Sequence, residues 1–113
     1  MKENNLILDR SFEFSLKIIS LFVELKKSNE FVLSKQILRS GTSIGANVEE
    51  GVAGYSKADF THKMGIALKE AREVRYWLRL LDKSQMIPGD YTWYINESTE
   101  IMNILGAIVR SSR

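Results

Sequence analysis

Three glutamates, Glu50, Glu70 and Glu73, are the residues best suited to acid–base or metal chemistry in this 113-residue sequence. Bundle proteins with di-iron centres use a Glu-x-x-His pair, with helical i, i+3 spacing, on each of two helices. Here Glu73 stands where the histidine would be, and the single histidine, His62, lies two turns before Glu70. We therefore interpret the carboxylates as a structural polar network or surface ion pairs. The sequence predicts no catalytic residue, no metal ligand and no cofactor.

Composition excludes several other kinds of chemistry. The absence of cysteine excludes a disulfide scaffold, a cysteine-ligated zinc or iron–sulfur site and a thiol nucleophile. The 16 Lys and Arg residues against 14 Asp and Glu residues give a formal net charge of +2. This value is too small to establish a polyanionic partner by itself.

A row of cations falls on one side of the third segment of the chain. Its members are Lys69, Arg72, Arg75, Arg79 and Lys83, with Tyr76 among them. On a helix with a rise of 1.5 Å per residue the row spans about 21 Å. Such a row can follow a phosphate backbone without reading bases, so we predict it as the candidate nucleic-acid-binding surface. The alternative interpretation is a solvated helix face.

Turn-forming residues at 28–29, 51–56 and 88–90 divide the chain into four segments, each long enough for several helical turns. Short connections between helices favour an antiparallel up-down bundle. We predict an all-α fold, with residues 1–113 forming one four-helix-bundle domain. No apolar stretch approaches the roughly 20 residues of a spanning helix. We expect no membrane association and a cytoplasmic location.

Apolar spacing identifies the core faces of the two central segments. In the third segment the spacing of 4 and 3 alternates over three heptads, at Phe60, Met64, Ala67, Ala71, Val74, Leu78 and Leu81. The second segment has Leu33, Ile37, Ile44 and Val48 on one face. Gly41 lies on that face too, and we expect it to permit close approach of another helix.

The first segment is apolar on two nearly opposite sides. One stripe consists of Phe12, Leu16, Ile19 and Val23; the second consists of Phe14, Ile18, Leu21, Phe22 and Leu25. A peripheral helix of a monomeric bundle needs only one apolar stripe. We therefore expect a second subunit to cover this helix, and we predict the second stripe as the homo-oligomer interface.

A polar row borders the core face of the second segment, at Gln36, Ser40, Ser43, Asn47 and Glu50. Polar groups at a core margin must find hydrogen-bond partners or stay hydrated. Glu70 and Glu73 flank the apolar seam of the third segment, within helical reach of Lys69 and Arg72.

These residues carry a family resemblance. The pattern is Gln36-x-x-Arg39-Ser40-x-x-Ser43-Ile44-x-x-Asn47-x-x-Glu50-Gly51, then Ser56, Lys57, Asp59 and Phe60, then Ile66-Ala67-x-Lys69-Glu70-Ala71-x-Glu73 and Tyr76-Trp77-Leu78. It resembles the four-helix-bundle proteins encoded in intervening sequences of bacterial 23S ribosomal RNA genes. The resemblance extends from about Arg10 to Val109 and is most specific between Gln36 and Leu81.

The resemblance implies a four-helix bundle with no enzymatic reaction. The chain is also similar to the accessory protein of diversity-generating retroelements, a homopentamer that binds nucleic acid and a reverse transcriptase. This similarity implies a five-subunit ring that presents basic residues to nucleic acid. The main hypothesis is a non-enzymatic homo-oligomer that binds RNA or DNA through phosphates. The alternatives are an adaptor that docks a larger protein, such as a reverse transcriptase, and a carboxylate-metal enzyme.

Overall fold

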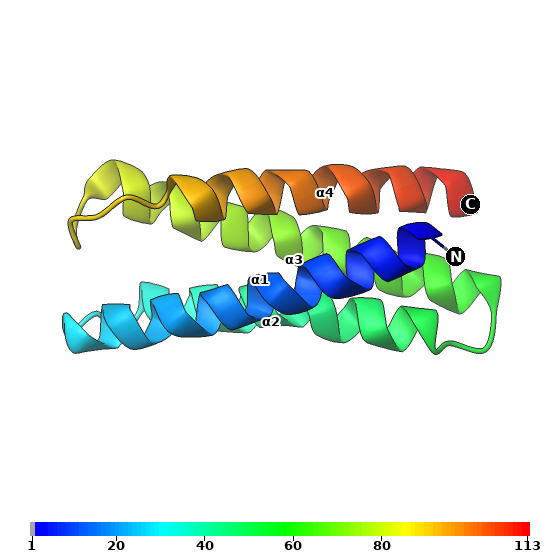
Figure 1. Ribbon diagram of the computed structural model, residues 1–113, viewed down its shortest axis with the longest axis horizontal. Helices are drawn as coiled ribbons and strands as arrows, with labels where there is room; N and C mark the ends of the chain where they lie inside the picture. The colour runs from blue at the N-terminus through cyan, green and yellow to red at the C-terminus, as the bar shows by residue number, and fades with distance from the viewer. Residues whose placement is uncertain (1) are drawn as a thin grey trace.

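The computed structural model describes residues 2–113, which form four α-helices joined by short segments. The helices are α1 (Lys2–Lys27), α2 (Leu33–Val52), α3 (Lys57–Ser84) and α4 (Thr92–Ser112). They run up and down along a rod with extents of 44 × 19 × 19 Å (Figure 1). The prediction of an all-α four-helix bundle is confirmed, and the described residues contain no strand.

Each helix packs against the next one along the chain, and α1 also contacts α4. A paired hydrogen bond supports this last contact: Arg10 Nε and Nη2 donate to Glu97 Oε2 and Oε1 at 2.7 and 3.0 Å. Tyr94 Oη donates to the backbone oxygen of Lys17 at 3.3 Å. These bonds join the first and last helices, so the ring of helices is closed.

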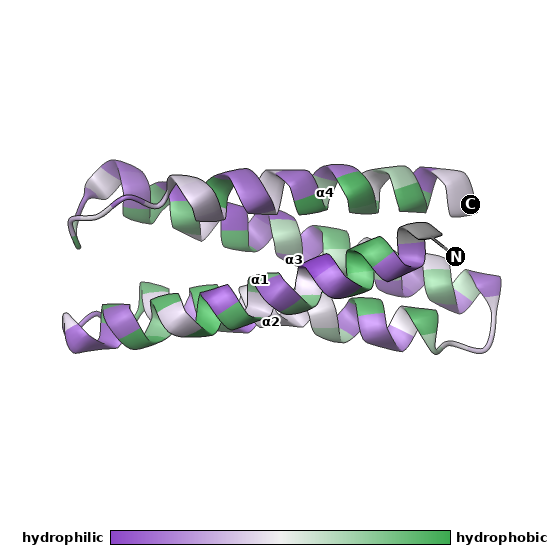
Figure 2. Ribbon diagram, in the orientation of Figure 1, coloured by the Kyte–Doolittle hydropathy of each residue, from purple (hydrophilic) through white to green (hydrophobic). Residues whose placement is uncertain are grey.

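The core follows the apolar spacing of the sequence. Every member of the predicted α3 seam is fully buried except Phe60, which is half-buried. The other helices contribute the aliphatic side chains of Ile7, Ile18, Leu25, Ile37, Ile44, Val48, Ile101 and Leu105. Hydrophobic and hydrophilic residues alternate along each ribbon in Figure 2, as expected for helices with one buried side.

Gly41 lets α1 and α2 approach closely, as the sequence predicts. A Cβ placed on Gly41 would lie 2.9 Å from Cγ1 and 3.0 Å from Cγ2 of Ile18. The equivalent Cβ on Gly45 would lie 3.4 Å from its nearest neighbours in Ser11 and Ser15, which is ordinary van der Waals contact. The two glycines of α2 therefore differ in how much space the neighbouring helix leaves them.

Alanine substitution should separate these two glycines. We expect Gly41→Ala to lower the free energy of unfolding by about 1–3 kcal/mol, since the methyl group overpacks against Ile18. We expect Gly45→Ala to be neutral or to raise it by up to about 1 kcal/mol through helix propensity. Urea denaturation of both variants checks the prediction, and a Gly41→Ala variant as stable as wild type would contradict it.

Glu30 caps the first turn of α2 with a buried carboxylate. Its Oε1 accepts from the N–H groups of Val32 and Leu33 at 3.0 and 2.9 Å, and its Oε2 accepts from Ser34 N at 2.6 Å. Burial alone would raise the pKa of Glu30, but these backbone hydrogen bonds outweigh it, and the pKa is lowered from its ordinary value. The turn predicted at residues 28–29 did not include this cap.

The lowered pKa makes this cap sensitive to pH. Its stabilisation is fully present above the ordinary glutamate pKa of about 4.3 and is lost as the pH falls through the lower pKa of the folded state. We expect Glu30→Gln to lower the free energy of unfolding by about 1–2 kcal/mol at pH 7. The difference in unfolding free energy between Glu30→Gln and the wild-type protein should shrink between pH 5 and pH 3. Chemical denaturation across this pH range measures both effects, and a constant gap would contradict the account.

Ser56 caps the N-terminus of α3, because its Oγ accepts from Asp59 N at 3.0 Å. At the other end, Gln85 adopts a left-handed conformation with φ of 50° and ends the helix. Within residues 2–113, no helix is both long enough and apolar enough to cross a bilayer.

Candidate nucleic-acid interface

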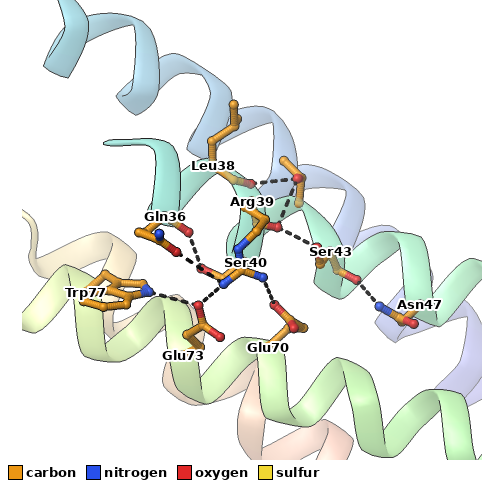
Figure 3. Close-up of polar contacts among 10 residues, drawn as sticks. Gln36, Leu38, Arg39, Ser40, Ser43, Asn47, Glu70, Glu73 and Trp77 are labelled. Atoms are coloured by element: carbon orange, nitrogen blue, oxygen red, sulfur yellow. Dashed lines mark hydrogen bonds and ion pairs between the residues drawn. The ribbon is translucent and has the colours of Figure 1, made fainter. Parts of the chain in front are cut away.

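A polar network joins α2 to α3 around one guanidinium group (Figure 3). Arg39 Nη1 donates to Glu70 Oε2 at 3.2 Å, and Arg39 Nη2 donates to Glu73 Oε2. Gln36 Oε1 accepts from the same Nη2 at 3.5 Å, and Trp77 Nε1 donates to Glu73 Oε2 at 3.2 Å. The two glutamates thus face a cation on the neighbouring helix rather than Lys69 or Arg72 on their own helix.

Two further members of the polar row, Ser43 and Asn47, form hydrogen bonds within α2. Ser43 Oγ donates to the backbone oxygen of Arg39 at 2.6 Å, and Asn47 Nδ2 donates to that of Ser43 at 2.8 Å. At the end of the row, Lys63 Nζ donates to Glu50 Oε1 at 3.2 Å. This ion pair is a second polar link between α2 and α3.

The carboxylates predicted as a possible acid–base or metal site are thus arranged as ion pairs. His62 is exposed. Within residues 2–113, no three His, Cys, Asp or Glu side chains form a group that could hold a metal ion. Gly51 is buried beside the Lys63–Glu50 ion pair, where a Cβ would lie 3.0 Å from Lys63 Cβ and 3.1 Å from Met64 Cε. This ion pair therefore lies where α2 and α3 are in close contact.

The predicted oligomer interface on α1 is wrong. Phe14 and Ile18 are fully buried in the core of the single chain, and Leu21 and Leu25 are 7% and 1% exposed. Phe22 is half-buried and lies under Lys26, whose Nζ is 5.2 Å from the ring centroid. The sequence shows two apolar stripes but does not indicate which of them faces α2, α3 and α4. The stripe predicted to contact another subunit is therefore the one that packs in the core.

The opposite stripe of α1 is exposed. Phe12 is 56% exposed, and Leu16, Ile19 and Val23 are each 45–46% exposed. Beside this stripe, α1 and α2 border a shallow apolar hollow of about 310 Å³, whose lining includes Phe12, Ile19 and Ala46. We call Phe12, Leu16, Ile19 and Val23 the α1 stripe. It is a row of apolar side chains on α1 that the single chain leaves exposed.

Of the cations predicted on α3, Arg72 and Arg75 lie beside α4. Lys69, Arg72, Arg79 and Lys83 are exposed, and Arg75 is half-buried, with its Nε donating to Thr99 Oγ1 of α4 at 2.8 Å. Among the side chains of residues 4–113, none of these five cations is paired with a carboxylate. Glu70 and Glu73 of α3 therefore face α2, whereas Arg72 and Arg75 of the same helix lie beside α4.

Arg110 of α4 and Arg113, which directly follows that helix, add two cations to this surface. Arg110 and Arg113 line a hollow of about 430 Å³ between α3 and α4, together with Arg72 and Asn103. The rest of the lining is apolar, from Leu68, Met102 and Val109, and the backbone of Gly106. We call Arg72, Arg110 and Arg113 the arginine hollow, and the five α3 cations together with Arg110 and Arg113 the basic surface.

Comparison with known proteins identifies the family. The family model described as 23S rRNA-intervening sequence protein matches residues 3–107. The chain belongs to the 23S rRNA-intervening sequence protein family. A crystal structure of a protein with unknown function from the S23 ribosomal protein family of Bacteroides thetaiotaomicron is similar, with 47% sequence identity and a TM-score of 0.90. The match covers 96% of this chain and 98% of that one. No curated protein matches the chain.

In this member of the 23S rRNA-intervening sequence protein family, Arg110 and Arg113 were not among the predicted binding residues. Arg113 follows the last residue of α4 and is three positions after Arg110, so both reach the same hollow. Steps of four residues lead from Arg110 to Gly106 and from Gly106 to Met102, and both of these residues line the hollow between α3 and α4. A helical projection of α4 could have shown this grouping, but only the folded chain places it beside Arg72.

Proposed function

We propose that the protein is a non-enzymatic homo-oligomer that binds RNA or DNA through backbone phosphates. The observation that supports this proposal is the basic surface, on which seven cations from two helices gather without a carboxylate partner among residues 4–113. A row of unpaired Lys and Arg side chains releases counterions from a nucleic acid when it neutralises phosphates. The same release does not occur at Arg39, which is already paired with Glu70 and Glu73.

The α1 stripe supports the homo-oligomer. Its four side chains lie on the side of α1 opposite the core, in a row along about 17 Å of helix. An exposed apolar row of this kind marks an interaction surface in a protein of this size. We propose that a second copy of the chain covers it, in a ring of five subunits as the resemblance implies. Each added copy repeats the basic surface and strengthens electrostatic attraction.

The proposed binding is independent of base sequence. Lysine and arginine side chains on a convex helix surface reach phosphates, whereas base readout needs an element that enters a groove. Fluorescence anisotropy with two unrelated RNA 20-mers and their DNA equivalents, single- and double-stranded, tests the proposal at about 50 mM salt. We expect binding to all, with affinities within a few-fold for unrelated sequences of one type. No binding to any of them would overturn the proposal.

A second candidate function is a protein adaptor, in which a larger partner protein covers the α1 stripe in place of a second copy of the chain. An adaptor would retain a specific co-purifying protein after nuclease treatment, whereas the proposed nucleic-acid binder would lose its cargo. Affinity purification with and without nuclease, followed by mass spectrometry, distinguishes the two.

A further inference from the structure

The arginine hollow is shaped differently from the rest of the basic surface. The cations along α3 stand on a convex helix, but Arg72, Arg110 and Arg113 surround a concavity of about 430 Å³ between two helices. This volume is within the range of small-ligand sites. On the basis of the proposed function, we infer that the hollow binds the phosphate monoester at the end of a nucleic-acid strand.

Charge favours a monoester over an internal phosphate. A phosphate monoester carries about −1.5 to −2 charges at pH 7, with three free oxygens, whereas a diester carries one charge. Arginine presents several N–H donors in a planar fork that suits phosphate oxygens. Three such groups, with no carboxylate partner among residues 4–113, provide more donors and charge than one diester can use.

Shape favours the end of a strand. An internal phosphate is attached to a sugar on both sides, so it reaches a convex surface more easily than a concave one. A terminal phosphate has one free side and can enter the hollow, while its attached nucleoside meets the apolar lining of Leu68, Met102 and Val109. The amide of Asn103, at the same hollow, can both donate and accept a hydrogen bond.

Gly106 shows how the hollow is kept open. It lies within α4, where glycine is unfavourable relative to alanine. The only atom near a Cβ placed on Gly106 is Nη1 of Arg110, at 3.2 Å. Core packing therefore does not require this glycine, but its bare backbone leaves room for the guanidinium at the edge of the hollow.

The test compares three RNA 10-mers of one sequence, with a 5′-phosphate, a 3′-phosphate or hydroxyls at both ends, by fluorescence anisotropy at pH 7.5. We expect at least one phosphorylated form to bind the wild-type protein about tenfold more tightly than the hydroxyl form, because the arginines donate charge-assisted hydrogen bonds to the terminal phosphate. Arg110→Gln should abolish this gain. Arg79→Gln is the matched control and should weaken all three forms alike while the gain remains.

A second variant separates the role of the hollow from simple charge. Gly106→Ala retains every cation and should raise the midpoint of thermal unfolding, because alanine favours a helix more than glycine does. It should nevertheless reduce the gain in affinity from the terminal phosphate, because the added methyl group displaces the Arg110 side chain. Equal affinities for all three RNAs, or a gain that survives Arg110→Gln, would overturn the inference and leave the proposed function intact. If no RNA binds, both fail. Adenosine monophosphate that binds as tightly as the phosphorylated RNA would overturn the assignment to a strand end.

Discussion

Leu16→Asp is expected to dissociate the proposed homo-oligomer into monomers while the helical fold is retained. Leu16 is 46% exposed in the single chain, at the centre of the α1 stripe. An aspartate there stays hydrated in the monomer, but an interface would bury it without a partner, at a cost of several kcal/mol. Sedimentation velocity measures the change in mass and circular dichroism measures the retained helix. Ser20→Asp adds the same charge to an exposed position of α1 outside the stripe and should leave the assembly intact.

Phe14→Asp should instead unfold the chain. Phe14 is fully buried and its ring is stacked on Trp93 of α4, with 6.3 Å between ring centroids. Loss of a buried phenylalanine costs about 3–5 kcal/mol, and a buried carboxylate adds to this. We expect little helical signal for this variant at 25 °C. A folded Phe14→Asp monomer together with an intact Leu16→Asp assembly would show that the buried and exposed stripes are wrongly assigned.

Neutralisation of three exposed cations should weaken nucleic-acid binding greatly. We expect the triple variant Arg72→Gln, Arg79→Gln and Lys83→Gln to bind duplex and single-stranded RNA about 100-fold or more weakly at 0.1 M salt, because each lost phosphate contact removes one counterion-release step. The loss should be similar for unrelated sequences, since phosphate contacts carry no base information. Anisotropy titrations measure the loss.

A charge-matched control tests whether position on the surface matters. The triple variant Lys26→Gln, Lys35→Gln and Lys57→Gln removes three exposed cations that lie outside the basic surface. It lowers the net charge by the same amount, and we expect it to change affinity by a few-fold only. An equal loss in both triple variants would contradict a defined binding surface and would indicate only a general attraction of the net charge.

The fold was predictable because each helix carries a local signal. The alternating 4 and 3 spacing from Phe60 to Leu81 fixes the buried side of α3, and Ser56 marks where that helix begins. The orientation of α1 was not predictable in this way. One stripe contains one phenylalanine and three aliphatic residues, and the other contains two phenylalanines and three aliphatic residues, so local periodicity does not separate them. The space at Gly41 for Ile18 and the stacking of Phe14 on Trp93 decide between them, and both are contacts between distant segments.

The candidate site was predictable along one helix but not across helices. The α3 cations share one side of their helix, so their grouping follows from spacing alone. The partner of Glu70 and Glu73 was missed, because Lys69 and Arg72 are near them in sequence whereas Arg39 meets them only when α2 packs on α3. The arginine hollow was missed for the same reason, since Arg110 reaches Arg72 only through the packing of α4 on α3.

The salt dependence of binding tests the central claim most directly. For duplex RNA or DNA, the logarithm of the association constant should fall linearly with the logarithm of salt concentration, with a slope of about −0.9 for each phosphate neutralised. If one subunit places four or more cations of the basic surface on phosphates, we expect a slope of about −3.5 or steeper for unrelated sequences alike. A slope near zero, or binding that depends on base sequence but not on salt, would contradict phosphate binding by this surface.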